Sequence, residues 1–152
     1  MLEIRRLTED DWRRWRALRL AALATDPDAF GSTLAEWSGP NDREERWRRR
    51  LADSPFSALV ELDGVAVGMV GAFPEGDAVE LVSLWVDPSA RGRGIGEAAI
   101  GAVVDFAAGR EVLLSVRVAN GPAIGLYRRC RFLDDGASPD DPRERRMRRP
   151  AS

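Results

Sequence analysis

The chain has 152 residues, a formal net charge of −2 and 44% hydrophobic residues. This length and composition predict a single domain over residues 1–152 with a buried core, and the near-neutral charge argues against binding to nucleic acid or to an anionic membrane. The sequence contains no histidine and no lysine, and its one cysteine is Cys130. These absences exclude a Ser-His-Asp triad, a Walker A lysine and a disulfide framework, and leave too few ligands for a structural zinc site. We expect no bound metal.

No apolar run approaches the ~20 residues of a transmembrane helix. The first residues, MLEIRRLTEDD, lack the apolar core of a signal peptide. A single cysteine is typical of a reducing compartment. We therefore expect a cytoplasmic protein that makes no membrane contact.

In chain order, Leu2–Arg6 predicts a short strand, and the helical spacing that follows predicts a helix to about Ala24. The segment Thr25–Asn41 is broken by Pro, Gly and Ser and predicts a loop with at most one short helix. Residues Asp42–Leu51 predict a second helix. Its arginines alternate with glutamates, which favours a solvated face.

Most strand signals lie in the second half of the chain. FSALVEL and VAVGMVGAF are joined by Asp63-Gly64, a strong hairpin signal. Ala78–Val86, a glycine-led helix and Val112–Val118 predict a βαβ unit with parallel strands. A last helix is predicted over about Pro122–Arg129, with Asn120 as a natural N-cap. Two weaker strands, Phe132-Leu133 and RERRMRR, complete the chain. The prediction is an α/β fold: a mixed central sheet of six to seven strands flanked by about four helices.

Three glycines, Gly92, Gly94 and Gly96, stand where the helix after Val86 begins. A glycine-rich loop that enters a helix exposes unpaired N–H groups at the positive end of the helix dipole. Arg91 and Arg93 add positive charge between the glycines. This pattern predicts a pyrophosphate site, with a flexible glycine-rich turn as the alternative.

GIGEAA also matches the dinucleotide fingerprint G-x-G-x-x-A, which would indicate a nucleotide-binding oxidoreductase. That fingerprint needs its first glycine directly after a strand and an acidic residue at the end of the next strand. Here DPSAR intervenes, and the next strand ends in Ala119-Asn120. The oxidoreductase stays an alternative with two features against it.

RGRGIG and NGPAIGLYRRCRF resemble two motifs of the GNAT family of N-acetyltransferases: the acetyl-CoA loop Q/R-x-x-G-x-G/A and the pattern N-x-x-A-x-x-L-Y-x-x-x-G-F. The element order is similar too, so the resemblance covers essentially the whole chain. It implies that acetyl-CoA binds between two parallel strands that splay apart, and that the acetyl group passes directly to an amine in a ternary complex. The cofactor-binding residues that it implies are Leu84, Trp85, Val86, Arg91, Gly92, Arg93, Gly94, Ile95, Gly96 and Asn120.

The resemblance also implies two catalytic residues. Tyr127 lies seven residues after Asn120, which puts both on one helix face, and the matching tyrosine of the family protonates the leaving thiolate. The alternative is an aromatic side chain that only packs. Glu80 is placed by strand alternation on the side of Leu84 and Val86, and in the family an acidic residue on this strand often accepts the amine proton, usually through water. The alternative is a solvated strand end.

Arg131 departs from the family pattern, which has glycine at this position. Glycine adopts a positive φ at little cost, whereas arginine would cost about 1 kcal/mol or force a different helix end.

The acceptor amine is not identified by the sequence. One hypothesis is a cationic pocket in which Asp26, Asp28 and Glu36 accompany aromatic residues of the segment Thr25–Trp47; the alternative is an ordinary loop. A non-catalytic acyl-CoA sensor or interaction module and a homodimer also remain open.

Overall fold

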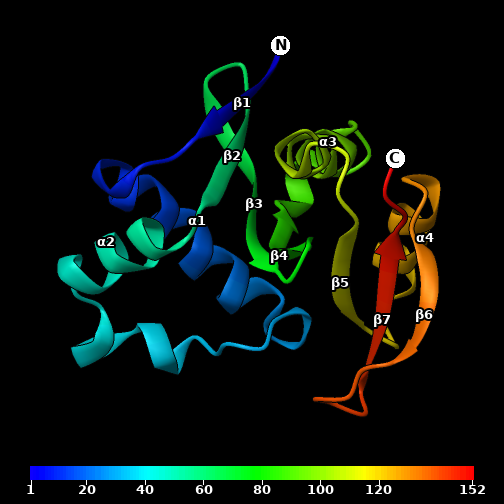
Figure 1. The fold of residues 1–152 in the computed structure, drawn as a ribbon. Coiled ribbons are helices and arrows are strands. Elements are labelled where there is room, and N and C mark those ends of the chain that lie inside the picture. Colours follow the sequence, from blue (N-terminus) through cyan, green and yellow to red (C-terminus); the bar gives the residue numbers. More distant parts are fainter.

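The computed structural model describes residues 1–152, which form one seven-stranded sheet in the order β1-β2-β3-β4-β5-β7-β6 (Figure 1). The strands are β1 Leu2–Arg6, β2 Phe56–Leu62, β3 Val65–Glu75, β4 Ala78–Val86, β5 Val112–Arg117, β6 Leu133–Ala137 and β7 Glu144–Arg149. The helices are α1 Trp12–Thr25, α2 Glu44–Asp53, α3 Ile95–Ala107 and α4 Gly121–Arg129. The mixed sheet with four α-helices confirms the predicted fold. No helix combines the length and the apolar character needed to cross a membrane.

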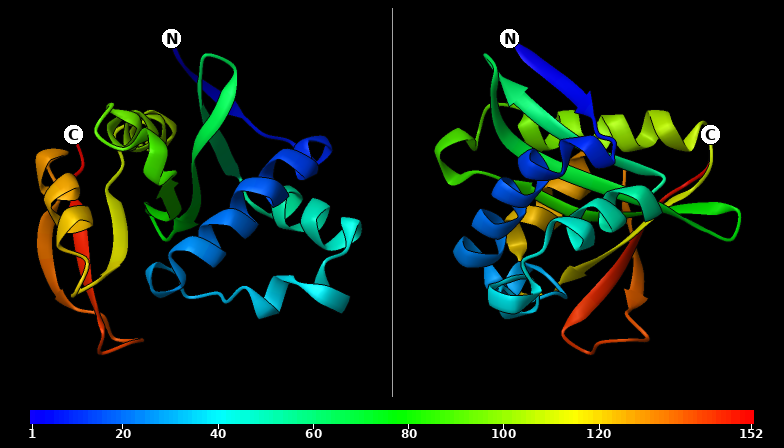
Figure 2. Two further views of the ribbon diagram at one scale, coloured as in Figure 1. Left: turned by 180° about the vertical axis from the view of Figure 1, so that it is seen from behind. Right: turned by 90° about the vertical axis from the view of Figure 1, so that its left-hand side faces the viewer.

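Two hydrophobic cores lie on opposite faces of the sheet. On one face α1 and α2 cover β1–β4, with Trp15, Trp47 and Trp85 buried between the layers. On the other face α3 and α4 pack over a core that includes Ile95 and Tyr127. The two helical layers are separated in the views of Figure 2, where α3 crosses one face and α1 lies on the other. The sheet therefore separates the two helical layers.

The local turn signals are confirmed. Asp63 and Gly64 have φ of 51° and 86°, the double positive φ of a two-residue hairpin turn between β2 and β3. The segment predicted as a loop with at most one short helix contains three short 3-10 turns, Pro27–Ala29, Ala35–Trp37 and Gly39–Asn41. Each turn satisfies backbone groups locally where Pro and Gly prevent a longer helix.

The sheet opens between β4 and β5. These parallel strands pair only at Val79↔Val112 and Glu80↔Leu113, whereas β5 pairs with β7 along its whole length. After Glu80 the β5-facing edge of β4 has no strand partner. Figure 1 shows β5, β6 and β7 leaning away from β1–β4, with α3 across the junction.

A β-bulge in β4 contradicts part of the strand analysis. Between two successive pairs β4 has one residue more than β3, and Ser83 has φ of 58°. The extra residue reverses the side-chain alternation: Leu81 packs on the α3 side, but Trp85 packs on the α1–α2 side. The prediction that Glu80 shares a side with Leu84 and Val86 is therefore wrong. Glu80 faces α1 and α2, whereas Leu84 and Val86 pack against the α3-side core.

Arg131 adopts the strained backbone of the glycine that it replaces. Its φ is 73°, its N–H donates to the Arg128 carbonyl at 3.0 Å, and the Phe132 N–H donates to the Tyr127 carbonyl at 3.0 Å. These two hydrogen bonds form a Schellman motif, and the Tyr127 and Phe132 rings make its hydrophobic contact at 5.7 Å. The helix end is therefore retained at the cost of a left-handed arginine.

The arginines of α2 are only partly a solvated face. Arg49 is exposed, and Arg48 pairs with Glu44 and Asp10 at the surface. The prediction is wrong for Arg50, whose Nη1 is enclosed without a hydrogen-bond partner. Arg50 lies instead on the rings of Trp15 and Phe73, 5.2 and 5.3 Å from their centroids.

Candidate active site

A cavity of about 530 Å³ occupies the opening between the carboxyl ends of β4 and β5. Leu81–Val86 of β4 and Ser115–Arg117 of β5 form its two sides, and the loop before α3 and the first turns of α4 close it. Its volume is within the usual range for small-ligand sites. Of the residues implied by the resemblance, all but Arg93 and Glu80 contribute to its wall.

The glycine loop is shaped as an anion site. Gly92 and Gly94 have φ of 81° and 79°, and Gly94 is the N-cap of α3 without a side-chain capping bond. The backbone N–H groups from Gly92 to Glu97 donate to no protein acceptor. These free donors stand at the positive end of the α3 dipole, where an anion is favoured. Glycine is needed at position 96 for a separate reason, which is close packing. A Cβ on Gly96 would lie only 2.7 Å from Leu126 Cδ2 of α4.

The two arginines of the loop have different surroundings. Arg91 Nε donates to the Val86 carbonyl at 3.1 Å, and its Nη2 donates to the Asp26 carboxylate at 2.9 Å. The same Asp26 oxygen accepts from Trp85 Nε1 at 2.7 Å. Arg91 thus ties the loop to β4 and to the end of α1. Arg93 is exposed and lies outside the cavity wall.

Asn120 and Tyr127 meet in the cavity from one helix. The Asn120 side-chain oxygen accepts from the Ala123 N–H at 3.2 Å and so caps α4, as the sequence predicts. Tyr127 is 7% exposed and lies one face-repeat further along the helix. Burial raises the pKa of its phenol above the usual value, and the neighbouring Cys130 adds to the shift. The hydroxyl therefore stays protonated at neutral pH.

Glu80 is half-buried beside the cavity rather than in its wall. Burial raises the pKa of its carboxyl, Arg146 opposes that shift, and Glu75, Asp140 and Glu144 add to it. A carboxylate whose charged form is disfavoured in this way is a stronger base than an exposed glutamate. Its position on β4 is just below the point where β4 and β5 separate.

The cationic pocket postulated for the acceptor is not assembled. Asp26 and Phe30 reach the cavity wall, but Glu36 is exposed and hydrogen-bonded to Thr33. The Trp37 and Trp47 rings pack against each other, tilted by 34° with their centroids 4.5 Å apart, and the Arg46 guanidinium covers the Trp37 ring at 3.9 Å. The acidic and aromatic residues of this segment thus serve mostly to hold it together.

Sequence reasoning missed Arg117 in the cavity wall. Its Nε donates to the Asp28 carbonyl at 2.9 Å, and its Nη1 pairs with Asp141 at 3.1 Å. These contacts join β5 to the turn after α1 and to the segment before β7. No local pattern marks such a residue, because its partners are distant in sequence.

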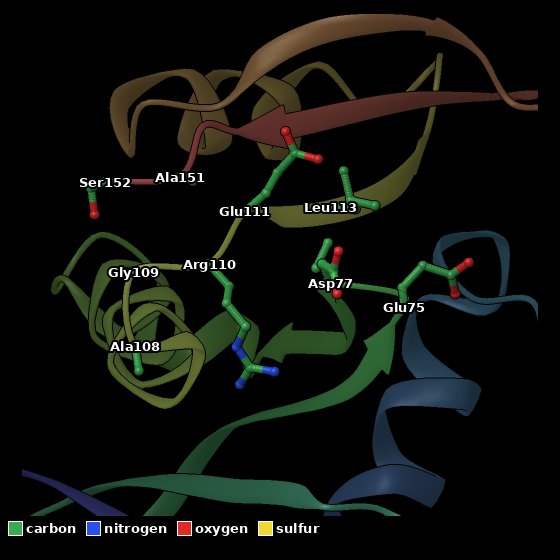
Figure 3. Close-up of a pocket in the computed structure, with 10 residues that line it drawn as sticks. Glu75, Asp77, Ala108, Gly109, Arg110, Glu111, Leu113, Ala151 and Ser152 are labelled. Carbon is green, nitrogen blue, oxygen red and sulfur yellow. The ribbon is translucent and has the colours of Figure 1, made fainter.

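A second hollow lies at the opposite end of β4 and β5, near the C-terminus (Figure 3). Glu75, Asp77, Arg110 and Glu111 line it, and the chain end at Ser152 closes one side. None of the predicted site residues contributes to it. The candidate active site is therefore the cavity between the carboxyl ends of β4 and β5.

A sheet split between two parallel strands, with a glycine-led helix across the split, is the arrangement expected of an acyl-CoA-binding N-acetyltransferase fold. The chain matches the Acetyltransferase (GNAT) family model over residues 5–132 and belongs to that family. A mycothiol acetyltransferase of Clavibacter michiganensis subsp. michiganensis is 34% identical over 137 residues, which cover 88% of this chain and 43% of that protein. The chain thus spans less than half the length of this curated relative.

Solved structures of the same fold cover the chain completely or nearly so. A GNAT-family acetyltransferase from Streptococcus pneumoniae has a TM-score of 0.79 at 18% identity, with 100% of both chains covered. The PaiA N-acetyltransferase of Thermoplasma acidophilum, solved in complex with coenzyme A, has a TM-score of 0.76 at 16% identity, with 99% of both chains covered. At these identities the likeness establishes the fold.

Proposed function

We propose that this chain is an acetyl-CoA-dependent N-acetyltransferase that moves the acetyl group directly to an amine acceptor in a ternary complex. The observation that carries the proposal is the set of free N–H groups from Gly92 to Glu97 at the mouth of the cavity. A pyrophosphate satisfies these donors and the α3 dipole together. Arg91, Gly92, Arg93, Gly94, Ile95 and Gly96 are assigned to this part of the co-substrate.

The unpaired edge of β4 suits the pantetheine arm. Trp85 and Val86 pair with β3 on one edge of β4, and Leu84, Trp85 and Val86 line the open cavity. Amide groups of the arm can pair with this edge as an added strand would. Asn120 stands on the opposite wall and contributes to the same site. The thioester would then lie within the cavity that Ser83 and Tyr127 both line.

The reaction needs two proton transfers: the attacking amine must lose a proton, and the leaving thiolate must gain one. The amine nitrogen attacks the thioester carbonyl carbon, the carbon–sulfur bond breaks, and the sulfur leaves as a thiolate. Tyr127, which keeps its proton at neutral pH, donates it to that sulfur. Glu80 accepts the amine proton through a water molecule, since its side chain is beside the cavity and not in its wall. Positioning of the two substrates supplies much of the remaining rate.

We further propose that residues 1–152 form one catalytic domain in the cytoplasm and that the reaction needs no metal. The acceptor is a small amine or a peptide amine, and the surface of net charge −2 does not favour nucleic acid. A non-catalytic acyl-CoA sensor is less favoured because Tyr127 is present in the cavity, and an oxidoreductase is not favoured by the family.

A thiol-release assay tests the proposal. The protein is incubated with acetyl-CoA and a panel of amines, amino acids, short peptides and aminoglycosides, and free coenzyme A is measured. We expect turnover with at least one class of amine and tight acetyl-CoA binding without any acceptor. Binding without turnover across the panel would favour the sensor, and absence of acetyl-CoA binding would contradict the proposal.

A further inference from the structure

Three enclosed side-chain nitrogens have no hydrogen-bond partner: Trp15 Nε1, Arg19 Nη1 and Arg50 Nη1. All three belong to one group, which we call the α1–α2 donor cluster. Trp15 and Arg19 are one turn apart on α1, and the Arg50 guanidinium of α2 lies 5.2 Å from the Trp15 ring centroid. Each of the three atoms is a donor. The cluster therefore lacks an acceptor of hydrogen bonds.

The two arginines of the cluster also lack a counter-charge. Arg19 is only 8% exposed, and neither residue takes part in an ion pair with a carboxylate. Burial, and to a smaller extent the nearby charge of Arg50, together lower the pKa of Arg19 to about 10. Leaving two like charges desolvated and unpaired opposes folding. Such an arrangement is typical of a binding site, where a ligand supplies the missing charge.

Stacking on aromatic rings compensates the two cations only in part. Arg19 lies 4.7 Å from the Phe30 centroid, and Arg50 lies over Trp15 and Phe73. Aromatic faces attract a cation, but they accept no in-plane hydrogen bond from the guanidinium edge. The donors at that edge remain unsatisfied.

The cluster adjoins the cavity. Phe30, on which Arg19 stacks, is part of the cavity wall. Arg50 Nη2 packs over Gly71, 3.6 Å from the position that a Cβ would take, and Val82 of the cavity wall packs over the same point at 3.3 Å. The cluster is thus on the α1–α2 side of the opening, the side that Glu80 faces. The phosphate loop is at the start of α3 instead.

We propose that the α1–α2 donor cluster binds an anionic group of the acceptor, so that the acceptor is an amine that carries a carboxylate or a phosphate in the same molecule. This inference rests on the proposed function and names its substrate class. Arginine pairs with carboxylate and phosphate oxygens in the same two-point manner, so both anions fit the cluster. A neutral amine leaves the three donors unpaired.

Equilibrium binding tests the proposal without catalysis. The melting temperature of the wild-type protein is compared in N-acetylphenylalanine and N-acetylphenylalaninamide, and in phosphoethanolamine and ethanolamine. We expect the charged member of at least one pair to stabilise the protein more than its neutral partner, and the responding pair identifies the anion as carboxylate or phosphate. Equal responses to both members of both pairs overturn the proposal.

Variants locate the effect. Arg19→Met and Arg50→Met are compared with Arg49→Met, which removes an exposed charge from the same helix as Arg50. The ratio of kcat/KM for phenylalanine to that for phenylalaninamide, or for the phosphate pair if that pair responds, is measured in each protein, so the intrinsic reactivity of each amine cancels. We expect this ratio to fall about 10- to 100-fold in the Arg19 and Arg50 variants and to hold in the Arg49 variant.

Stability separates a binding role from a structural one. Because an apolar side chain replaces an unpaired buried charge, Arg50→Met should melt no lower than Arg49→Met. A lower melting temperature together with an unchanged kcat/KM ratio would show that the arginines only support packing, and would overturn the proposal. Acetyl-CoA titration of the wild-type protein is the separate test of the proposed function, since that site does not include the cluster.

Discussion

The proposed cofactor site and the proposed acceptor site both offer positive charge, but they are built differently. In the cofactor site the donors are backbone N–H groups of Gly92 to Glu97 at the cavity wall, exposed because glycine permits the φ of Gly94. In the acceptor site they are the guanidinium groups of Arg19 and Arg50, brought together from two helices behind the cavity wall. A site built from backbone groups can be recognised from consecutive residues of the sequence. A site built from side chains of distant segments depends on how those segments pack.

The largest expected effect is on the cofactor side, from Tyr127→Phe. The change removes only the hydroxyl, so kcat should fall by about 10² to 10⁴ through loss of the general acid. Acetyl-CoA affinity, measured by calorimetry, should hold because the lost interaction matters mainly in the transition state. Near-normal single-turnover rates would remove Tyr127 from the mechanism; the single-turnover measurement excludes masking by slow product release.

Glu80→Gln tests the proton acceptor on the other side. Burial raises the pKa of Glu80, so the wild-type kcat/KM should fall as the pH drops through a value above the 4.5 of an ordinary glutamate. At lower pH the carboxylate is protonated and accepts no proton. In Glu80→Gln the acidic limb of the pH profile should be absent. At neutral pH the kcat/KM of the variant should be about hundredfold lower than that of the wild type. Asp77→Asn, at an exposed position nearby that does not contribute to the Glu80 shift, is the control, and an unchanged limb in Glu80→Gln would exclude Glu80 as the base.

Alanine substitutions at two glycines of β3 test how tightly the two faces of the sheet are packed. A Cβ on Gly68 would lie 2.8 Å from Ile95 Cγ2, the first residue of α3, whereas a Cβ on Gly71 would lie 3.3 Å from Val82 on the acceptor side. Gly68→Ala should therefore destabilise the protein by about 1–3 kcal/mol through overpacking. Gly71→Ala should cost less. Urea denaturation measures both, and equal costs would contradict the tight α3 contact.

The smallest expected effect is a gain, from Arg131→Gly. The left-handed backbone of Arg131 favours glycine, and the Schellman hydrogen bonds do not involve its side chain. The free energy of unfolding should rise by about 1 kcal/mol. Arg128→Gly, inside α4, is the opposite control and should destabilise by a similar amount. A loss of stability in Arg131→Gly would mean that the side chain makes contacts that outweigh the backbone strain.

The sequence predicted elements whose signals are local. The Asp63-Gly64 turn, the Asn120 cap and the start of α3 at Gly94 each depend on residues within one or two turns of chain. The βαβ order then required β4 and β5 to be parallel. Together these features placed the cavity and most of its wall.

The errors arise where tertiary packing decides. Ser83 has no sequence signal for a positive φ, yet the bulge there moves Glu80 to the opposite face from Leu84. Arg50 belongs to a charge run of ordinary appearance, and only the approach of α1 encloses it. A period-2 pattern cannot report an inserted residue, and charge patterning cannot report which arginine is covered.

Calorimetric titration of acetyl-CoA into the wild-type protein, Gly94→Glu and Gly101→Glu tests the central claim most directly. Both variants add a carboxylate near or on α3, but Gly94 is at the free N–H groups and Gly101 is exposed in the middle of the helix with nothing within 4 Å of its Cβ position. We predict that Gly94→Glu loses about hundredfold or more in affinity, because a like charge is placed at the pyrophosphate and the positive φ of Gly94 disfavours any side chain, while Gly101→Glu binds as the wild type does. Wild-type affinity in Gly94→Glu would contradict the assignment of the glycine loop as the cofactor site.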